Sequence, residues 1–189
     1  MRPFLPLLLA AQATFSPVMS RAQLPALPAP SAPAESVATS FLTHMKAQDW
    51  PGAAQYFDSR EIARFADVFQ RYAAQPQAGE GMAQILGITR EELLALPPAD
   101  LFAQFLAVGA KANPDLYEAM KTSTYQILGR IAEDSDQVHL VLRGAMTLKG
   151  VAFSAVEVRS FHRSPQGWRL QMPPEMSGLV LGLEAGLQH

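Results

Sequence analysis

Residues 137–163, QVHLVLRGAMTLKGVAFSAVEVRSFHR, carry the clearest structural pattern of this chain. In the first half of this stretch, apolar residues recur at every second position, which is the period of a β-strand that buries one face. Lys149-Gly150 stands in the middle with the composition of a tight turn. A short turn makes the two flanking strands antiparallel neighbours, so the stretch predicts a β-hairpin.

The same period continues on both sides of this hairpin. Residues 122–133 alternate in the same way, and 133–136 is a polar turn that leads into the hairpin. After the hairpin, the segment 164–167 forms another turn before a strand over 168–172. Because every connection is short, the four strands are predicted to form an antiparallel meander.

The residues before the sheet follow the helical period of 3.6 instead. Asp58 with Glu61, and Thr89 with Glu92, form capping-box patterns that mark helix starts. The predicted helices lie within 36–49, 53–57, 58–72, 89–96, 101–113 and 116–121, with a loop over 76–81 and a last helix after Pro173-Pro174. Helices followed by a meander predict an α+β domain whose helices pack on one face of the sheet.

The first 35 residues differ from the rest in composition. Arg2 precedes an apolar run over 4–11, which is too short for a bilayer-spanning helix of about 20 residues. Small residues follow at signal-peptidase spacing, with Ser20-Arg21-Ala22 and Ala11-Gln12-Ala13 as the two candidate cleavage sites. We therefore predict a signal peptide over 1–22, a Pro/Ala-rich linker over 23–35 and a single domain over 36–189. The mature chain is predicted to be exported to the periplasm or beyond, with no integral membrane segment.

Composition excludes several classes of function. The chain has 189 residues, a formal net charge of −2 and no cysteine. Nucleic-acid-binding domains usually carry an excess of Lys and Arg, which this chain does not have. The absence of cysteine excludes disulfides and thiolate metal sites. The four histidines form no metal-binding spacing, and no nucleophile elbow or phosphate loop is present. We expect no metal and no cofactor.

Two further motifs resemble a known superfamily. The segment Lys46-Ala47-Gln48-Asp49-Trp50, followed by Ala53-Ala54-Gln55-Tyr56-Phe57, resembles the opening of nuclear-transport-factor-2-like proteins, which include the ketosteroid isomerases. Gly167-Trp168-Arg169-Leu170 on the last strand also looks like that family. The resemblance spans most of 36–172 and implies a cone in which a curved sheet wraps helices around a pocket. The chain departs from the family in the long helical insertion over 76–121 and in its last helix.

Glu157 and Arg159 are the candidate pocket residues, together with Phe153 and Phe161 on the same strand face. If Lys149-Gly150 alone is the loop, Glu157 lies opposite Leu142 on the core side, and the charged pair lines an apolar pocket. If the loop has three residues, the pairing slips by one, and the pair joins a charge ladder on the opposite face. The second register is favoured because charges are rarely buried without need.

Other residues support either a core or a binding role. The regularly spaced aromatic and methionine residues are interpreted as core first: Phe65, Phe69, Phe102, Phe105, Met146 and Trp168. A subset of them could line a cavity for an apolar ligand, which the sequence alone does not distinguish from a filled core. The last helix, which contains 178–183, is apolar nearly all round. It must therefore be buried on this domain or on a partner. The simpler interpretation is packing on its own sheet, and the alternative is contact with an envelope protein or with a second copy in a homodimer.

These observations lead to three functional hypotheses. The leading one is an exported non-enzymatic domain that binds a small apolar ligand or an envelope protein. The second is a small cofactor-free isomerase, lyase or hydrolase that uses Glu157 as its base, because Asp58 and Asp100 are better explained as helix caps. The third is a structural module that docks through its last helix.

Overall fold

The computed structural model describes residues 24–187, and the predicted signal peptide lies outside that range. Seven helices come first: α1 (Ala34–Ala47), α2 (Trp50–Ala54), α3 (Ser59–Ala74), α4 (Pro76–Leu86), α5 (Arg90–Ala95), α6 (Pro98–Ala112) and α7 (Pro114–Lys121). The strands follow: β1 (Thr124–Ala132), β2 (Gln137–Leu148), β3 (Val151–Ser164) and β4 (Gly167–Leu170), and then α8 (Pro174–Gly186). The sheet order β1-β2-β3-β4 is an antiparallel meander, which confirms the predicted α+β class.

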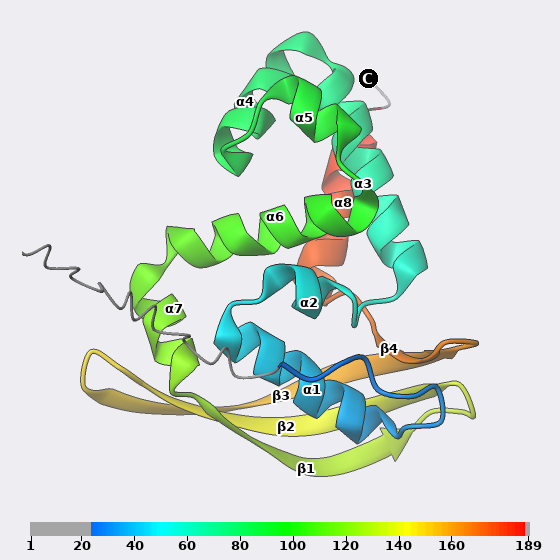
Figure 1. Cartoon of the computed structure of the whole chain (residues 1–189), viewed down its shortest axis with the longest axis vertical. Helices are drawn as coiled ribbons and strands as arrows, with labels where there is room; N and C mark the ends of the chain where they lie inside the picture. Colours follow the sequence, from blue (N-terminus) through cyan, green and yellow to red (C-terminus); the bar gives the residue numbers. More distant parts are fainter. Residues whose placement is uncertain (1–23, 188–189) are drawn as a thin grey trace, which may run out of the picture.

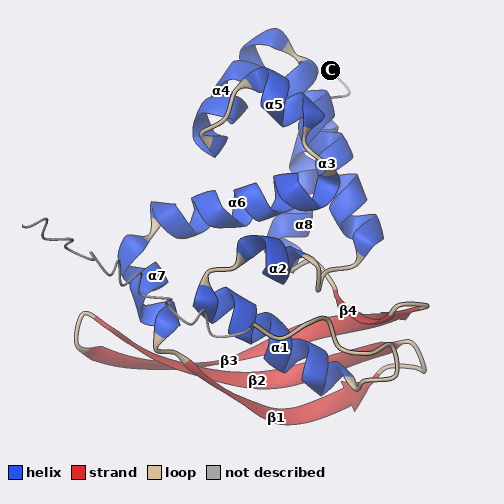
Figure 2. Ribbon diagram, viewed as in Figure 1, coloured by secondary structure: helices blue, strands red, loops and turns tan. Residues whose placement is uncertain are grey.

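The helices all lie over one face of the sheet (Figures 1 and 2). α1 and α7 contact the strands, whereas α3, α4, α5, α6 and α8 stack further away from the sheet. The inner face of the sheet contributes Val138, Leu140, Leu142 and Phe161 to the core, all of them buried. Aromatic side chains join the layers, since Phe57 packs against both Phe41 and Phe102 at ring-centroid distances of 5.5 and 4.8 Å.

The linker segment lies against the domain over part of its length. The carbonyl oxygen of Pro25 is 2.8 Å from Nε2 of His44, whose Nδ1 is 2.7 Å from a carboxylate oxygen of Asp49. Further along, the backbone of Pro30 lies so close to Gly167 that a Cβ there would approach it to 2.8 Å. These contacts fix the path of the chain into α1.

Two predictions about the helices are wrong. Residues 76–81, predicted as a loop, begin α4: Pro76 occupies the first turn, and a Cβ on Gly79 would lie 2.0 Å from the carbonyl oxygen of Ala73. Gly79 therefore permits a close approach to the end of α3 and does not mark a loop. The last helix packs on α3 rather than on the sheet, because Pro173-Pro174 turns the chain away from β4 and Arg64 bonds Glu184 at 2.9 and 2.6 Å.

The β2–β3 turn settles the register of the hairpin. Leu148 pairs with Val151, so Lys149-Gly150 alone is the loop, and both residues have positive φ, 49° and 79°. Two left-handed residues are what a type I′ turn requires. Glu157 therefore lies opposite Leu142, and Arg159 opposite Leu140, on the inner face. The favoured prediction, a charge ladder on the outer face, is wrong.

We expect the Gly150→Ala substitution to lower the free energy of unfolding by about 1–2 kcal/mol, because a Cβ is disfavoured at positive φ. Gly109→Ala, in the last turn of α6 with no atom within 4 Å of the added Cβ, is the matched control. It should raise stability by about 0.5–1 kcal/mol through helix propensity. Urea unfolding of both variants checks this, and equal effects of the two substitutions would contradict the turn assignment.

Candidate functional site

The structure does not gather the four predicted pocket residues around one cavity. Phe161 is 1% exposed and belongs to the core. Phe153, eight residues earlier on β3, is 51% exposed near the end of the hairpin. Glu157 and Arg159 lie between them, partly buried, and bond each other at 3.0 and 3.2 Å. The common face of β3 thus carries a core residue, an ion pair and an exposed ring.

Glu157 and Arg159 do line a hollow, which we name the edge hollow. It measures about 610 Å³ and lies between residues 157–160 of β3 and residues 171–175, which lead from β4 into α8. Both charges reach solvent there, which makes the charged pair tolerable on the inner face. Because Arg159 engages both oxygens of Glu157, the carboxylate is held in a structural contact.

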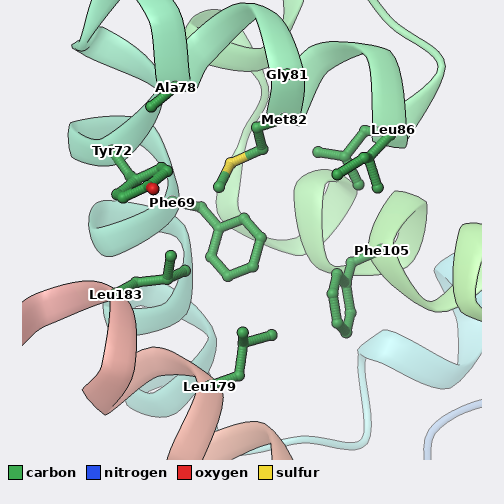
Figure 3. Close-up of a pocket in the computed structure, with 10 residues that line it drawn as sticks. Phe69, Tyr72, Ala78, Gly81, Met82, Leu86, Phe105, Leu179 and Leu183 are labelled. Carbon is green, nitrogen blue, oxygen red and sulfur yellow. The ribbon is translucent and has the colours of Figure 1, made fainter. Parts of the chain in front are cut away.

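A second cavity, which we name the helical cleft, lies among α3, α4, α6 and α8. It measures about 460 Å³. Its lining is almost entirely apolar and consists of Phe69, Tyr72, Ala78, Gly81, Met82, Ile85, Leu86, Phe105, Leu179 and Leu183. Figure 3 shows labelled side chains of α3, α4, α6 and α8 converging on this space, with Met82 reaching down toward Phe69.

Helical spacing brings these residues together. Phe69 and Tyr72 are three apart on α3, and Met82 and Leu86 are four apart on α4, so each pair shares a helix face. The floor is rigid because the Phe69 ring stacks on Phe65 at 4.1 Å and meets Phe105 edge-on at 5.6 Å. The rim is open, since Ile85 is 71% exposed.

Gly81 contributes space to the helical cleft. No heavy atom lies within 4 Å of the position that its Cβ would occupy, so a larger residue there would project into open volume. Met82 beside it is unbranched and adapts to cavities of irregular shape. The sequence identified Phe69 and Phe105 as cavity candidates but missed the contribution of α4, because 76–81 had the composition of a loop.

The helical cleft has few polar side chains. The hydroxyl of Tyr72 is the one polar side-chain group among the lining residues, and none of them carries a charge. Within residues 24–187, no group of three or more His, Asp or Glu side chains is placed to hold a metal ion. In the same part of the chain, no helix has the length and apolarity to cross a membrane. The chemistry that the helical cleft offers is the burial of apolar surface.

A cluster of titratable groups lies at the start of α3, outside both cavities. Asp58 caps the helix by accepting from the backbone N–H of Arg60 at 2.9 Å, and its carboxylate also accepts two bonds from the Arg60 guanidinium, at 3.1 and 2.8 Å. These bonds lower the pKa of Asp58. Burial raises the pKa of the neighbouring Glu61, although that carboxylate accepts the backbone N–H of Met172 at 2.6 Å. The cluster ties α3 to the segment after β4 and so serves the fold.

The sequence matches no protein-family model and no curated protein sequence. A function for this chain is therefore inferred from its fold and from the edge hollow and the helical cleft.

The lowered pKa of Asp58 predicts a dependence of stability on pH. The ionised Asp58 contributes its full stabilisation of the fold above pH 3.8, the pKa of this group in the unfolded chain. That stabilisation is lost as the pH falls toward the lower pKa of Asp58 in the folded state. Asp58→Asn keeps a capping oxygen but loses the charge, so we expect it to cost about 1 kcal/mol at pH 7 and less as the pH falls below 4. Chemical unfolding at several pH values measures this, and a constant difference between the two proteins would refute it.

Proposed function

We propose that this protein is an exported binding protein whose helical cleft holds a small, uncharged, mainly hydrocarbon ligand. The observation that carries the proposal is the lining of the helical cleft, ten residues with one hydroxyl and no charge. Its volume of about 460 Å³ falls within the range of roughly 300–1,000 Å³ that is typical of small-molecule sites.

The chemistry of the cleft narrows the class of ligand. A charged group in contact with Phe69, Leu86 and Phe105 would lose its hydration without gaining a partner, which disfavours ionic ligands. Tyr72 offers one hydroxyl that can donate to or accept from a single polar atom of the ligand. An acyl chain or a fused ring system with one hydroxyl or carbonyl group fits both conditions.

The location of the cleft also distinguishes this chain from the family it resembles. We infer that the domain is a variant of the nuclear-transport-factor-2-like cone in which core side chains fill the inner face of the sheet. Leu140, Leu142 and Phe161 occupy that face and are buried. In this proposal the binding site has moved outward to α4 and α6, within the insertion 76–121, and to α8.

The two other hypotheses have less support. A base at Glu157 needs a free carboxylate oxygen near an apolar substrate, and Arg159 engages both oxygens. Docking through α8 competes with ligand binding for Leu179 and Leu183, which line the helical cleft.

The direct experiment uses the predicted mature form, residues 23–189, purified from the exported fraction and examined by native mass spectrometry. Extra mass that is released on denaturation would identify a resident ligand. The purified protein would then be titrated with the neutral apolar dye N-phenyl-1-naphthylamine, whose fluorescence rises in apolar surroundings. Saturable binding at one site per chain supports the proposal, and the absence of saturable binding would overturn it.

We expect Ile85→Arg to weaken dye binding at least about tenfold, because it places a charge and a longer side chain at the rim of the cleft. Ile85 is largely exposed, so the substitution should leave the fold intact. Leu181→Arg is the matched control: this exposed leucine of α8 lies outside the lining, and the variant should bind the dye as the wild type does. Equal loss in both variants would place the dye elsewhere.

A further inference from the structure

A third cavity lies where the linker crosses the domain, and we name it the strap pocket. It measures about 570 Å³. Its walls come from residue 27 of the linker, from residues 54–63 and 97–99 of the helical part, and from residues 166 and 169 at β4. It shares no lining residue with the helical cleft or the edge hollow. The strap pocket is therefore a separate candidate site.

The linker forms one wall of the strap pocket because both ends of the segment 25–30 are fixed on the domain. At one end, Nε2 of His44 donates to the carbonyl oxygen of Pro25 at 2.8 Å. At the other end, the backbone of Pro30 lies against Gly167, where a Cβ would approach it to 2.8 Å. Leu27 lies between these two contacts, lines the pocket and is 40% exposed. The linker thus contributes to the pocket as well as leading into α1.

Arg169 is the one charged residue among those that line the strap pocket. It is partly buried, and its Nη1 donates to the carbonyl oxygen of Trp168 at 2.8 Å. Within residues 24–187, no Asp or Glu forms an ion pair with it. Asp58 precedes the lining residue Ser59, but Arg60 already binds its two carboxylate oxygens at 3.1 and 2.8 Å. A guanidinium has five N–H donors, so Arg169 keeps donors for an anion.

Most of the other lining residues are apolar. Phe57 and Ile62 are buried and form the base of the pocket. Leu27 and the ring carbons of Pro97-Pro98 are exposed at its mouth. An apolar surface beside one cation with unused donors is suited to a ligand that has a hydrocarbon body and one anionic group.

We propose that the strap pocket binds a small monocarboxylic acid, with its carboxylate on Arg169 and its hydrocarbon body against Phe57, Ile62 and Leu27. A guanidinium can donate two parallel N–H bonds to one carboxylate, and this geometry selects a planar carboxylate. One positive charge balances one negative charge. A phosphate monoester, which carries nearly two negative charges, would leave one of them without a partner. This ligand differs in charge from the neutral ligand proposed for the helical cleft.

The test uses the predicted mature form, residues 23–189, titrated by isothermal calorimetry at pH 7. The two probes are sodium octanoate and 1-octanol, which have the same number of carbons and differ in the charged group. We expect octanoate to bind at one site per chain, at least about tenfold more tightly than octanol, because octanol cannot form the charged contact with Arg169.

Arg169→Gln should weaken octanoate binding at least about tenfold, because it removes the charge and the forked pair of donors. Arg143→Gln is the matched control, since Arg143 is an exposed residue of β2 outside the lining. The control should bind octanoate as the wild type does. Circular dichroism verifies the fold of both variants.

A charge at position 27 tests whether the linker borders the site. Leu27→Asp and Leu27→Lys remove the same apolar contact but place opposite charges at the mouth of the pocket. We expect the Asp variant to bind octanoate at least about tenfold more weakly than the Lys variant. The same two substitutions at Leu128, a leucine of β1 that is also 40% exposed, are the control and should not differ from each other.

The absence of saturable octanoate binding would overturn the proposal, and so would equal affinities for octanoate and octanol. Unchanged octanoate binding by Arg169→Gln, or an equal loss in Arg143→Gln, would overturn it as well. Arg169→Gln should still bind N-phenyl-1-naphthylamine as the wild type does, because the helical cleft shares no residue with the strap pocket. Failure of this proposal and failure of the proposal for the helical cleft therefore give different results.

Discussion

The two-residue turn at Lys149-Gly150 sets the register between β2 and β3. Both residues adopt positive φ, and the pairing of Leu148 with Val151 follows directly. Because side chains alternate across a strand, a slip of one residue would move every side chain of β3 to the other face. The turn thus buries Phe161 and brings Glu157 and Arg159 to the inner face.

A second constraint is that the sheet extends beyond the helices that cover it. α1 and α7 contact the strands, but residues 151–156 of β3 remain exposed on both faces. The remaining helices pack on one another instead, and α3 is central because it contacts α4, α5, α6 and α8. Four helices that meet around the ring of Phe69 cannot fill the space between them completely, and the helical cleft is what remains.

The order of the helices and strands could be predicted from the sequence, but the location of the candidate binding site could not. The change of period near residue 122 and the short turns predicted the meander, because alternation of apolar and polar residues is typical of a strand that buries one face. The hairpin register could not be predicted, since a glycine at position 150 suits both a two-residue and a three-residue loop. The composition of 76–81 indicated a loop because the reason for Gly79 is its contact with Ala73, which is visible only in three dimensions. Phe69 and Phe105 have the same spacing in a filled core as in the wall of a cleft, so periodicity could not locate the cavity.

α8 borders both the edge hollow and the helical cleft. Its first residues, Pro174 and Glu175, line the edge hollow, and its later residues, Leu179 and Leu183, line the helical cleft. Coupling between the regions would require a second stable position of this helix. The bidentate bond from Arg64 to Glu184 and the burial of Val180 hold α8 against α3 in one position. The structure therefore favours a rigid α8, so that occupation of the helical cleft would leave the edge hollow unchanged.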